Sequence, residues 1–381
     1  MIEKPINEKS VAKLSLFYRF VVWLIAFTSR YVFHGIRYYF PDQTKMIQLT
    51  HPVVAFANHV DERDVPLLAS IHPYLSPKSK YSLPVRRDIM EKNFLIKEFR
   101  PKGIAKFIFH IVDVTNVIPK LFKYVGGIPV ARPFRDDAKE LLRAGKLRDI
   151  VNEQWDVLLK GIQKGRKLFL FPEGTLSSDG SIGQIRKGVF FLQERIQNLN
   201  LLPFTLTYDF LTDKKPLAHV GFGKMFQLKS GLTEHEVAME LKKALNSYFT
   251  LTSGNLFSFA ILTEDVRAGI GRHFLFYKMK KLAEELDKKG IIYIAKELLV
   301  KSYNELFAEI LAKAKQEGFI EFTSEKKYRG TEKLYSMVAT DAPNTGKRRL
   351  RKVHPYLYHL NQLKGFHDTI VEIWNNIEVY D

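Results

Sequence analysis

The sequence predicts an α/β fold in which a mixed central sheet is flanked by helices and followed by a mostly helical C-terminal part. Three short apolar runs, at residues 52–57, 167–171 and 201–208, are typical of buried strands. The first two end abruptly at polar residues, where a helix-like or turn-like segment follows. A longer charged segment of helical character lies between them, at 136–164. Strands that alternate with helices indicate an α/β sheet.

The composition allows two domains and favours an anionic partner. The chain has 381 residues, 46% of them hydrophobic, and a formal net charge of +18 with a pI near 9.6. An excess of this size suggests nucleic acid, anionic lipid or a phosphorylated substrate. The chain contains no cysteine, which excludes disulfides, a thiol nucleophile and zinc–thiolate sites.

Residues 11–40 are the most apolar and aromatic part of the chain. Their longest uncharged run, Phe20 to Ser29, has ten residues, whereas a membrane-spanning helix needs about 20. No small-residue cleavage site follows, so we do not expect a cleavable signal. Lys and Arg residues bracket Trp23 and several Phe and Tyr residues, which is typical of helices that lie in the headgroup region, here as a helical hairpin. We expect a membrane-associating helical segment over 1–45; the alternative is that it packs on the protein's own core.

The stretch NHVDERD follows the strand 52–57 and contains His59 and Asp64. A histidine can take a proton near neutral pH, and a carboxylate beside it can fix its tautomer. On a regular helix, residues five positions apart point about 140° apart. The two side chains can therefore meet only if His59 lies on the strand-to-helix turn and Asp64 in the first helical turn. The alternatives are a surface or capping histidine, or a metal site that includes Asp61, although no second His or Cys cluster supports a metal.

The next segments predict a strand around 80–85, a helix across 88–99 and a strand from Ile128 to Ala131 that ends at Arg132. Ligands of α/β sheets bind beyond the carboxyl ends of strands, where an arginine can hold a phosphate with two hydrogen bonds. A solvated arginine at a strand end is the alternative interpretation.

The strand 167–171 leads directly into the turn PEGTLSSDG. Glu173 directly after a buried strand is hard to explain by packing alone. Gly174 permits a close backbone approach, and Thr175 is one of several donors that could hold phosphate oxygens. Arg186 and Lys187 add two cations before an apolar helix at 189–192. The sequence has neither a P-loop nor a GxGxxG motif, so a nucleotide-binding fold lacks its usual signature.

Four segments, NHVDERD, GGIPVARP, FPEGT and LLPFTL, together resemble the four motifs of the glycerolipid acyltransferase family in order and rough spacing. These are the PlsC-like enzymes that acylate glycerol-3-phosphate or lysophosphatidic acid. The first and third motifs are close matches. The second departs from the family, because Ala131 precedes the arginine where an acidic residue is common, and the fourth is only an apolar strand with a proline. The resemblance covers about residues 50–210.

The resemblance implies an α/β acyltransferase domain of the HX4D type over 46–230. It implies that His59 is the general base and that Asp64 orients it, with direct attack on an acyl thioester and no acyl-enzyme. By the same resemblance, Arg132, Glu173 and Gly174 position the glycerol phosphate, and Thr175 is a neighbouring donor. Arg186 and Lys187 stand where the family often has a basic residue paired with a glycine. Asp61 and Glu62 are then interpreted as carboxylates at a helix N-terminus, and Asn58 as a residue that stabilises the turn.

Residues 231–381 are predicted to form a mostly helical accessory domain of unknown role. Amphipathic helices are indicated within 235–317, short strands or a loop at 318–335, and a last helix at about 356–377. The segment DAPNTGKRRLR, which ends at Arg351, is turn-rich and basic, and we expect an exposed loop or a contact with lipid headgroups. A winged-helix fold that binds DNA is the alternative.

We therefore expect an O-acyltransferase of phospholipid biosynthesis, associated with the cytoplasmic face of a membrane as a peripheral or monotopic protein. Acyl-CoA or acyl-ACP is the expected co-substrate, and glycerol phosphate or a lysophospholipid, foremost 1-acylglycerol-3-phosphate, the expected acceptor. No cofactor or metal is expected, and the expected partner is an anionic membrane surface rather than nucleic acid. The rival hypotheses are a phospholipid transacylase and a non-catalytic protein that binds lipid or nucleic acid.

Overall fold

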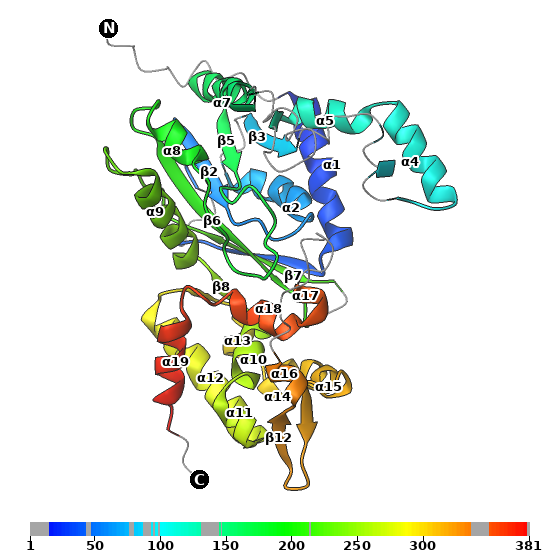
Figure 1. The fold of residues 1–381 in the computed structure, drawn as a ribbon, viewed down its shortest axis with the longest axis vertical. Helices are drawn as coiled ribbons and strands as arrows, with labels where there is room; N and C mark the ends of the chain where they lie inside the picture. Colours follow the sequence, from blue (N-terminus) through cyan, green and yellow to red (C-terminus); the bar gives the residue numbers. More distant parts are fainter. Residues whose placement is uncertain are drawn as a thin grey trace.

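The computed structural model describes residues 15–42, 47–75, 80–86, 93, 96–97, 100–130, 145, 147–212, 215–336 and 350–378. Two parts are visible along the long axis of the molecule: a sheet with helices on both sides, and a smaller, mostly helical module below it (Figure 1).

A mixed sheet of seven strands organises the first part, counted over the described residues. Its order is β1-β7-β6-β2-β5-β3-β4, and only β6 and β7 pair in antiparallel fashion. The strands are β1 (Gly35–Tyr39), β2 (Val53–Ala57), β3 (Tyr81–Arg86), β4 (Gly127–Val130), β5 (Lys167–Leu170), β6 (Asn200–Asp209) and β7 (Leu217–Phe222). The predicted α/β class with a mixed sheet is confirmed.

Strand β2 is buried on both faces of this sheet. Val53 and Ala55 face one hydrophobic core, and Val54 and Phe56 face the other. Such an uninterrupted apolar run is typical of a central parallel strand, because helices cover both sides. The first core includes helix α2 (Asp64–Ile71); the second includes helices α7 (Leu147–Gln163), α8 (Gly188–Gln193) and α9 (Glu234–Ser247).

The N-terminal segment differs from the predicted helical hairpin. Helix α1 (Leu16–Val32) packs on α2, and the chain then enters the sheet as β1, parallel to β7. The sequence GIRYY favours a strand because its β-branched and aromatic side chains fill a pleated surface: Ile36 and Tyr38 pack against the core beside α2. The prediction of a helical segment over 1–45 is therefore wrong for Gly35–Tyr39, which form a strand.

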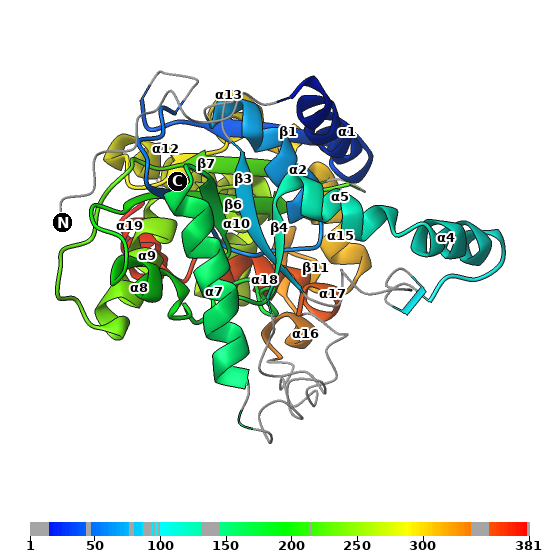
Figure 2. The same ribbon diagram turned by 90° about the horizontal axis from the view of Figure 1, so that it is seen from above.

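Two amphipathic helices that the sequence did not indicate lie between β3 and β4. They are α4 (Ile104–Val114) and α5 (Val117–Val125). Seen from above, α4 projects from the body of the molecule beyond α5 (Figure 2). The predicted helix 88–99 lies largely outside the described residues. In the part of the chain that the structure describes, no helix is both long and apolar enough to cross a membrane.

The C-terminal module has its own hydrophobic core. Its helices are α10 (Ser253–Ile261), α11 (Glu264–Ala268), α12 (Arg272–Lys289), α13 (Lys296–Val300), α14 (Tyr303–Leu306), α15 (Ala308–Gln316), α16 (Glu332–Tyr335), α17 (Leu350–Val353), α18 (Pro355–Asn361) and α19 (His367–Asn375). Its short strands are β8 (Thr250–Leu251), β9 (Ile270–Gly271), β10 (Tyr293–Ile294), β11 (Ile320–Phe322) and β12 (Lys327–Gly330).

Several predictions for this module hold, and others need correction. The short strands expected at 318–335 are β11 and β12, which form an antiparallel hairpin. The last of the amphipathic helices expected within 235–317 is three short helices, α13, α14 and α15. The helix expected at about 356–377 is two, α18 and α19, and Gly365 between them packs tightly against the side chain of Asn246. Helix α9 does not belong to the module, because Val237 and Leu241 pack beneath the large sheet.

Helices α17 and α18 join the module to the loops of the sheet (Figure 1). The amide of Leu350 donates to the carbonyl of Ser178 at 3.1 Å, and the side chain of Asn361 donates to the carbonyl of Asp179 at 3.0 Å. Gly180 has φ +98°, and a Cβ there would lie 2.2 Å from the carbonyl oxygen of Tyr358. The approach is therefore too close for any side chain.

Candidate functional site

The structure brings His59 and Asp64 together at the carboxyl end of β2. Nδ1 of His59 lies 2.6 Å from Oδ2 of Asp64, and Asp64 is the first residue of α2. This is the strand-to-helix arrangement that the spacing required. The imidazole keeps 16% of its side-chain surface exposed, whereas the carboxylate is completely buried. A carboxylate at Nδ1 favours the tautomer that is protonated there, and Nε2 is then the atom that can accept a proton.

Asp64 is held by more than the histidine. Its carboxylate accepts the backbone amides of Val60 at 2.9 Å and Asp61 at 3.3 Å. Its second oxygen accepts the phenol of Tyr208 at 2.5 Å. Burial raises the pKa of Asp64, and the hydrogen bonds from His59 and Tyr208 act against that increase. Burial and the neighbouring carboxylate raise the pKa of Tyr208 well above its usual value, so it stays a hydrogen-bond donor.

Glu173 ties two loops of the site together. One carboxylate oxygen accepts the backbone amide of His59 at 2.9 Å, and the other accepts that of Gly183 at 2.6 Å. The residue is only 2% exposed. Burial raises its pKa, although both amide hydrogen bonds lower it. Glu173 thus positions the backbone of the histidine, and the predicted contact with a glycerol phosphate stays a prediction.

Three further contacts fix the loop that carries His59. The ring of Phe171 stacks on the imidazole with centroids 4.1 Å apart and an interplanar angle of 8°. The amide of Ser177 donates to the carbonyl of His59 at 2.8 Å. The side chain of Asn58 pairs with the backbone of Leu206 on β6 through bonds of 2.9 and 2.8 Å. These two bonds join Asn58 to β6, and its role in stabilising the turn stays an interpretation.

The other predicted substrate-binding residues lie around the same turn. Gly174 has φ +67°, the left-handed region that favours glycine, and a Cβ there would lie 3.7 Å from Arg186. The amide of Arg186 donates to the carbonyl of Pro172 at 2.8 Å, and its side chain is exposed. Thr175 and Lys187 are exposed as well. Arg132 lies outside the described residues, and the role of this set in binding a substrate stays a prediction.

A residue of the C-terminal module reaches the same loop. Nη1 of Arg351 donates to Oδ2 of Asp61 at 2.7 Å, with 16% and 4% of the two side chains exposed. The guanidinium also lies over the ring of Phe210, 4.0 Å from its centroid. Burial by itself would raise the pKa of Asp61, but the hydrogen bond and the charge of Arg351 outweigh it and lower the pKa.

This contact corrects two expectations. Arg351 is not part of a solvated loop or a headgroup contact, because its side chain is largely enclosed against Asp61 and Phe210. Asp61 is more than an exposed carboxylate at a helix N-terminus: it accepts the amide of Arg63 at 3.2 Å and is bound by Arg351. The remaining basic residues of that segment, 347–349, lie outside the described residues. Among the described residues, no group of three or more His, Asp or Glu side chains is arranged to hold a metal ion.

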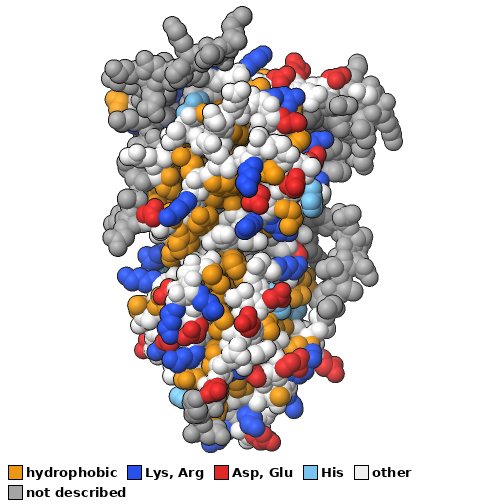
Figure 3. Space-filling model, turned by 90° about the vertical axis from the view of Figure 1, so that its left-hand side faces the viewer, with side chains coloured by type: hydrophobic (Ala, Val, Ile, Leu, Met, Phe, Trp, Pro, Cys, Tyr) orange, Lys and Arg blue, Asp and Glu red, His pale blue; other side chains and the backbone are white. Residues whose placement is uncertain are grey.

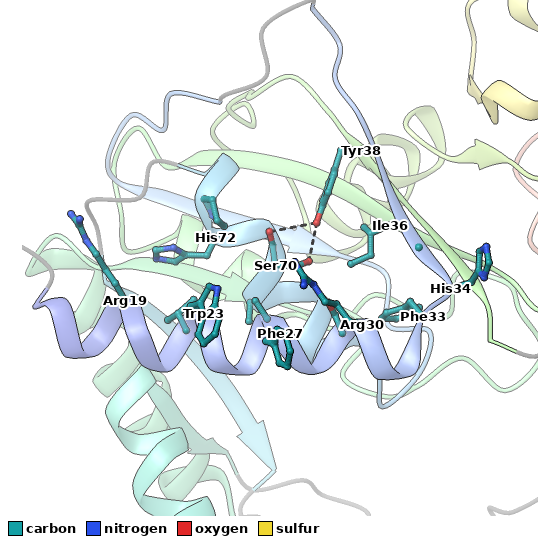
Figure 4. A pocket seen from close by; sticks show the side chains of 16 residues that line it. Arg19, Trp23, Phe27, Arg30, Phe33, His34, Ile36, Tyr38, Ser70 and His72 are labelled. Atoms are coloured by element: carbon teal, nitrogen blue, oxygen red, sulfur yellow. Dashed lines mark hydrogen bonds between the residues drawn. The ribbon is translucent and has the colours of Figure 1, made fainter.

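Two cavities lie along α2. A cavity of about 170 Å³ lies between α1, α2 and α5 and is lined almost entirely by apolar side chains, among them Val65, Leu68 and Phe169. Val65 directly follows Asp64, so this cavity reaches the histidine end of α2. A second cavity, of about 640 Å³, lies at the other end of the helix (Figure 4). There the phenol of Tyr38 donates to the hydroxyl of Ser70 at 3.0 Å.

Fold and site together define an α/β protein with a tethered His–Asp pair at the carboxyl end of a central parallel strand. No family model and no curated protein sequence matches the chain. Among solved structures, the chain is similar to the 1-acyl-sn-glycerophosphate (LPA) acyltransferase PlsC from Thermotoga maritima, with 14% sequence identity and a TM-score of 0.37. The match covers 60% of this chain and 78% of that one. At this TM-score, neither the family nor the activity of the chain follows from the likeness.

Proposed function

We propose that this protein transfers a fatty acyl group from acyl-CoA or acyl carrier protein to the hydroxyl of a glycerol phosphate or lysophospholipid, with 1-acylglycerol-3-phosphate as the first acceptor to test. The observation that carries the proposal is the His59–Asp64 pair. Its 2.6 Å hydrogen bond leaves Nε2 of a partly exposed imidazole available as a base. The resemblance of NHVDERD and FPEGT to acyltransferase motifs selects acyl transfer among the reactions that such a base can serve.

The proposed reaction needs a base but no covalent enzyme intermediate. Nε2 of His59 accepts the proton of the acceptor's hydroxyl group. At the same time the oxygen of that hydroxyl group attacks the carbonyl carbon of the thioester. The carbon–sulfur bond of the resulting tetrahedral intermediate then breaks, and the thiolate leaves with the proton from the imidazolium. Asp64 stabilises the imidazolium throughout. A positioned base of this kind contributes about 10²–10⁴-fold to the rate.

Two features near the pair suit the two ends of such substrates. The apolar cavity between α1, α2 and α5 begins beside Asp64, and its lining of Val65, Leu68 and Phe169 matches an acyl chain. On the other side, Gly174 and the exposed Arg186 lie on the turn that Glu173 ties to the histidine loop. We propose that cations of this turn, together with Arg132, hold the phosphate of the acceptor.

The membrane is the proposed source of the lipid substrate. Helix α1 exposes Trp23, Phe17 and Phe20, and Arg19 and Arg30 lie on the same helix. Aromatic and basic residues side by side are typical of a helix at the interface of a bilayer. Attachment through such a helix needs no membrane-spanning segment.

Product analysis tests the proposal directly. The purified protein is incubated with acyl-CoA or acyl-ACP and a panel of acceptors: glycerol-3-phosphate, 1-acylglycerol-3-phosphate and other lysophospholipids. Formation of one acylated product with release of the free thiol supports the proposal. Acylation that needs a diacyl phospholipid as donor would identify a transacylase, and the absence of any acylated product with either thioester would refute acyl transfer.

A further inference from the structure

We propose that α4 and α5, inserted between β3 and β4, form with α1 a single docking surface for a membrane that carries anionic phospholipids. The inference deepens the proposed function, because it identifies where the lipid surface would meet the protein. It depends on the exposure, the packing and the charge of three helices that come from two separate stretches of the chain.

Exposed hydrophobic residues are concentrated on these helices. Of the 19 large hydrophobic side chains that are exposed among the described residues, 13 lie on α1, α4 and α5. The 13 are Leu16, Phe17, Phe20, Trp23, Leu24, Tyr31, Ile104, Phe107, Ile108, Ile111, Val114, Val117 and Tyr124. Soluble proteins seldom expose apolar residues in such a concentration, except where they meet a partner or a membrane.

The pattern on α4 is that of an amphipathic helix turned outward. Ile104, Phe107, Ile108 and Ile111 follow the i, i+3, i+4, i+7 spacing of one helix face, and all four are exposed. The acidic residue of the helix, Asp113, is buried and accepts the amide of Ile96 at 3.1 Å. The carboxylate of α4 therefore faces the protein, whereas Lys106, His110 and the apolar face are exposed to the surroundings.

The three helices form one continuous surface. The rings of Phe17 and Tyr124 meet edge to face with centroids 5.3 Å apart, which joins α1 to α5. The hydroxyl of Ser15 lies 3.1 Å from that of Tyr124, and the phenol of Tyr18 donates to the carbonyl of Val125 at 3.4 Å. Both ribbon views show α1, α5 and α4 on the same side of the molecule (Figures 1 and 2).

The charge of this region selects an anionic lipid surface as the occupant. Residues 15–42 and 100–130 hold eight Lys or Arg residues and two acidic residues, the buried Asp113 and Asp42, which pairs with Lys224. On the side of the molecule away from α4, by contrast, acidic and basic side chains are interspersed (Figure 3). Each Lys or Arg near an anionic bilayer adds about 1 kcal/mol to binding, which is about a fivefold change.

A cationic groove beside α5 gives the headgroups a place to bind. It has a volume of about 740 Å³, and its cations come from α5, α7 and the residues that follow α7. They are Lys120, Lys123, Lys160, Lys164 and Arg166. The hydroxyl of Ser82, which also lines the groove, is completely buried and has no hydrogen-bond partner among the described residues. A phosphate oxygen would be an acceptor for the Ser82 hydroxyl and for the cations of the groove, of which Lys120 also donates to the carbonyl of Thr115 at 3.3 Å.

Flotation of the full chain with vesicles tests the surface. The vesicles contain phosphatidylcholine alone or with phosphatidylglycerol. Phe107→Ser is compared with Phe322→Ser, a matched control on β11, because Phe107 is 67% and Phe322 45% exposed. We expect Phe107→Ser to reduce partitioning into vesicles about tenfold or more, since it removes an aromatic side chain that would insert into the lipid. Phe322→Ser should leave partitioning unchanged. Ile111→Ser should repeat the effect of Phe107→Ser.

The charged residues are tested in the same assay. The double variant Lys120→Gln, Lys123→Gln should bind vesicles that contain phosphatidylglycerol at least tenfold more weakly than the wild type does. It should bind vesicles of pure phosphatidylcholine as strongly as the wild type does. Equal vesicle binding by the wild type and Phe107→Ser would overturn the inference. The inference would also be overturned if light scattering showed that the wild type is a dimer and that Phe107→Ser is a monomer. The surface would then bind a second copy of the chain.

Vesicle binding does not require turnover, so this result is separate from the proposed activity. With water-soluble short-chain substrates, Phe107→Ser should keep wild-type turnover. If the wild type and His59→Ala both bind vesicles but the wild type transfers no acyl group to any acceptor, the proposed function fails and the docking surface stands.

Discussion

The phenol of Tyr208 donates a 2.5 Å hydrogen bond to the oxygen of Asp64 that does not face His59. This bond lowers the pKa of Asp64 against the effect of burial. Tyr208→Phe should therefore raise the pKa of Asp64 further, so that the acid limb of kcat/KM against pH moves to higher pH. It should also lower the free energy of unfolding by about 1.5–3 kcal/mol.

A matched control separates this effect from a general loss of a hydroxyl group. Tyr38→Phe removes a phenol that donates to Ser70 at the opposite end of α2. Its pH profile should be that of the wild type. An unchanged acid limb in Tyr208→Phe would contradict the role of this bond in the site.

Replacement of the base should abolish acyl transfer without unfolding the protein. In His59→Ala we expect a loss of about 10²–10⁴-fold in kcat, because only the proton acceptor is removed. Asp64→Asn should lose activity as well, since a neutral amide does not stabilise the imidazolium. Rates with the best acceptor of the panel and circular dichroism provide the two measurements. His367→Ala, an exposed histidine on α19, is the control, and near wild-type turnover in His59→Ala would rule out the mechanism.

Glu173 offers a test between two roles. The sequence predicts that it binds the acceptor, whereas the structure shows its carboxylate on the amides of His59 and Gly183. Glu173→Gln turns an NH₂ group toward one of these amides, which should cost about 1–3 kcal/mol of stability. If the residue positions the loop, kcat falls and a high acceptor concentration does not restore the rate. A rise in KM at constant kcat would instead support direct contact with the acceptor.

The ion pair between Arg351 and Asp61 should matter for both stability and activity. Arg351→Met removes the closer of the two arginines beside the buried carboxylate of Asp61, with Arg63 left at 3.6 Å, and breaking a buried ion pair in this way destabilises proteins by up to about 3–5 kcal/mol. Adding Asp61→Asn to this variant should recover part of the stability, and a double-mutant cycle from denaturant unfolding measures the coupling. Lys352→Met, a neighbouring change on the same helix, is the control. Equal melting temperatures of Arg351→Met and the wild type would show that the contact contributes nothing.

The buried His219 should make the free energy of unfolding of the protein depend on pH. It is completely buried on β7, where its Nδ1 lies 2.9 Å from the phenol of Tyr39. Burial and then the charge of Arg37 lower the pKa of His219 to about 3. The unfolded chain therefore binds a proton below about pH 6.5 that the folded protein does not bind. Stability should fall as the pH drops from about 6.5 towards 3, with a limiting slope of about 1.4 kcal/mol per pH unit.

This slope can be assigned to one residue. His219→Gln keeps a hydrogen-bonding group for Tyr39 but does not titrate, so urea unfolding at several pH values should show a shallower dependence than in the wild type. The exposed His273→Gln should leave the dependence unchanged. The same slope in all three proteins would assign it to other groups.

The sequence revealed the strands that are buried on both faces, because an uninterrupted apolar run such as 53–57 has few other interpretations. It did not reveal β1 or β7. The residues of β1 continue the apolar, aromatic sequence of α1, so the pattern shows no boundary between the two elements. In β7, the polar His219 interrupts the apolar run that would indicate a buried strand. Helices α4 and α5 were missed although α4 carries an amphipathic pattern, and that pattern could not have shown that its apolar face points outward, because an inward face gives the same spacing.

The site was predictable only where its residues are near in sequence. His59 and Asp64 are five positions apart, and the strand-to-helix boundary is visible between them. Tyr208 and Arg351 reach the same loop from 144 and 290 residues away. No local pattern encodes such contacts, because they depend on how β6 lies beside β2 and on how the C-terminal module packs. The role of Glu173 as an acceptor of two backbone amides likewise requires the folded loops.

The contact between Arg351 and Asp61 has a consequence for how the protein is made. Asp61, on the loop that carries His59, is synthesised 290 positions before Arg351, the cation that binds it. A nascent chain on the ribosome, or a product shortened by a late stop codon or by proteolysis of its C-terminal end, holds Asp61 without that partner. The contact can therefore form only after the chain has been synthesised past Arg351, and removal of α17 and α18 should leave the loop that carries His59 less firmly held.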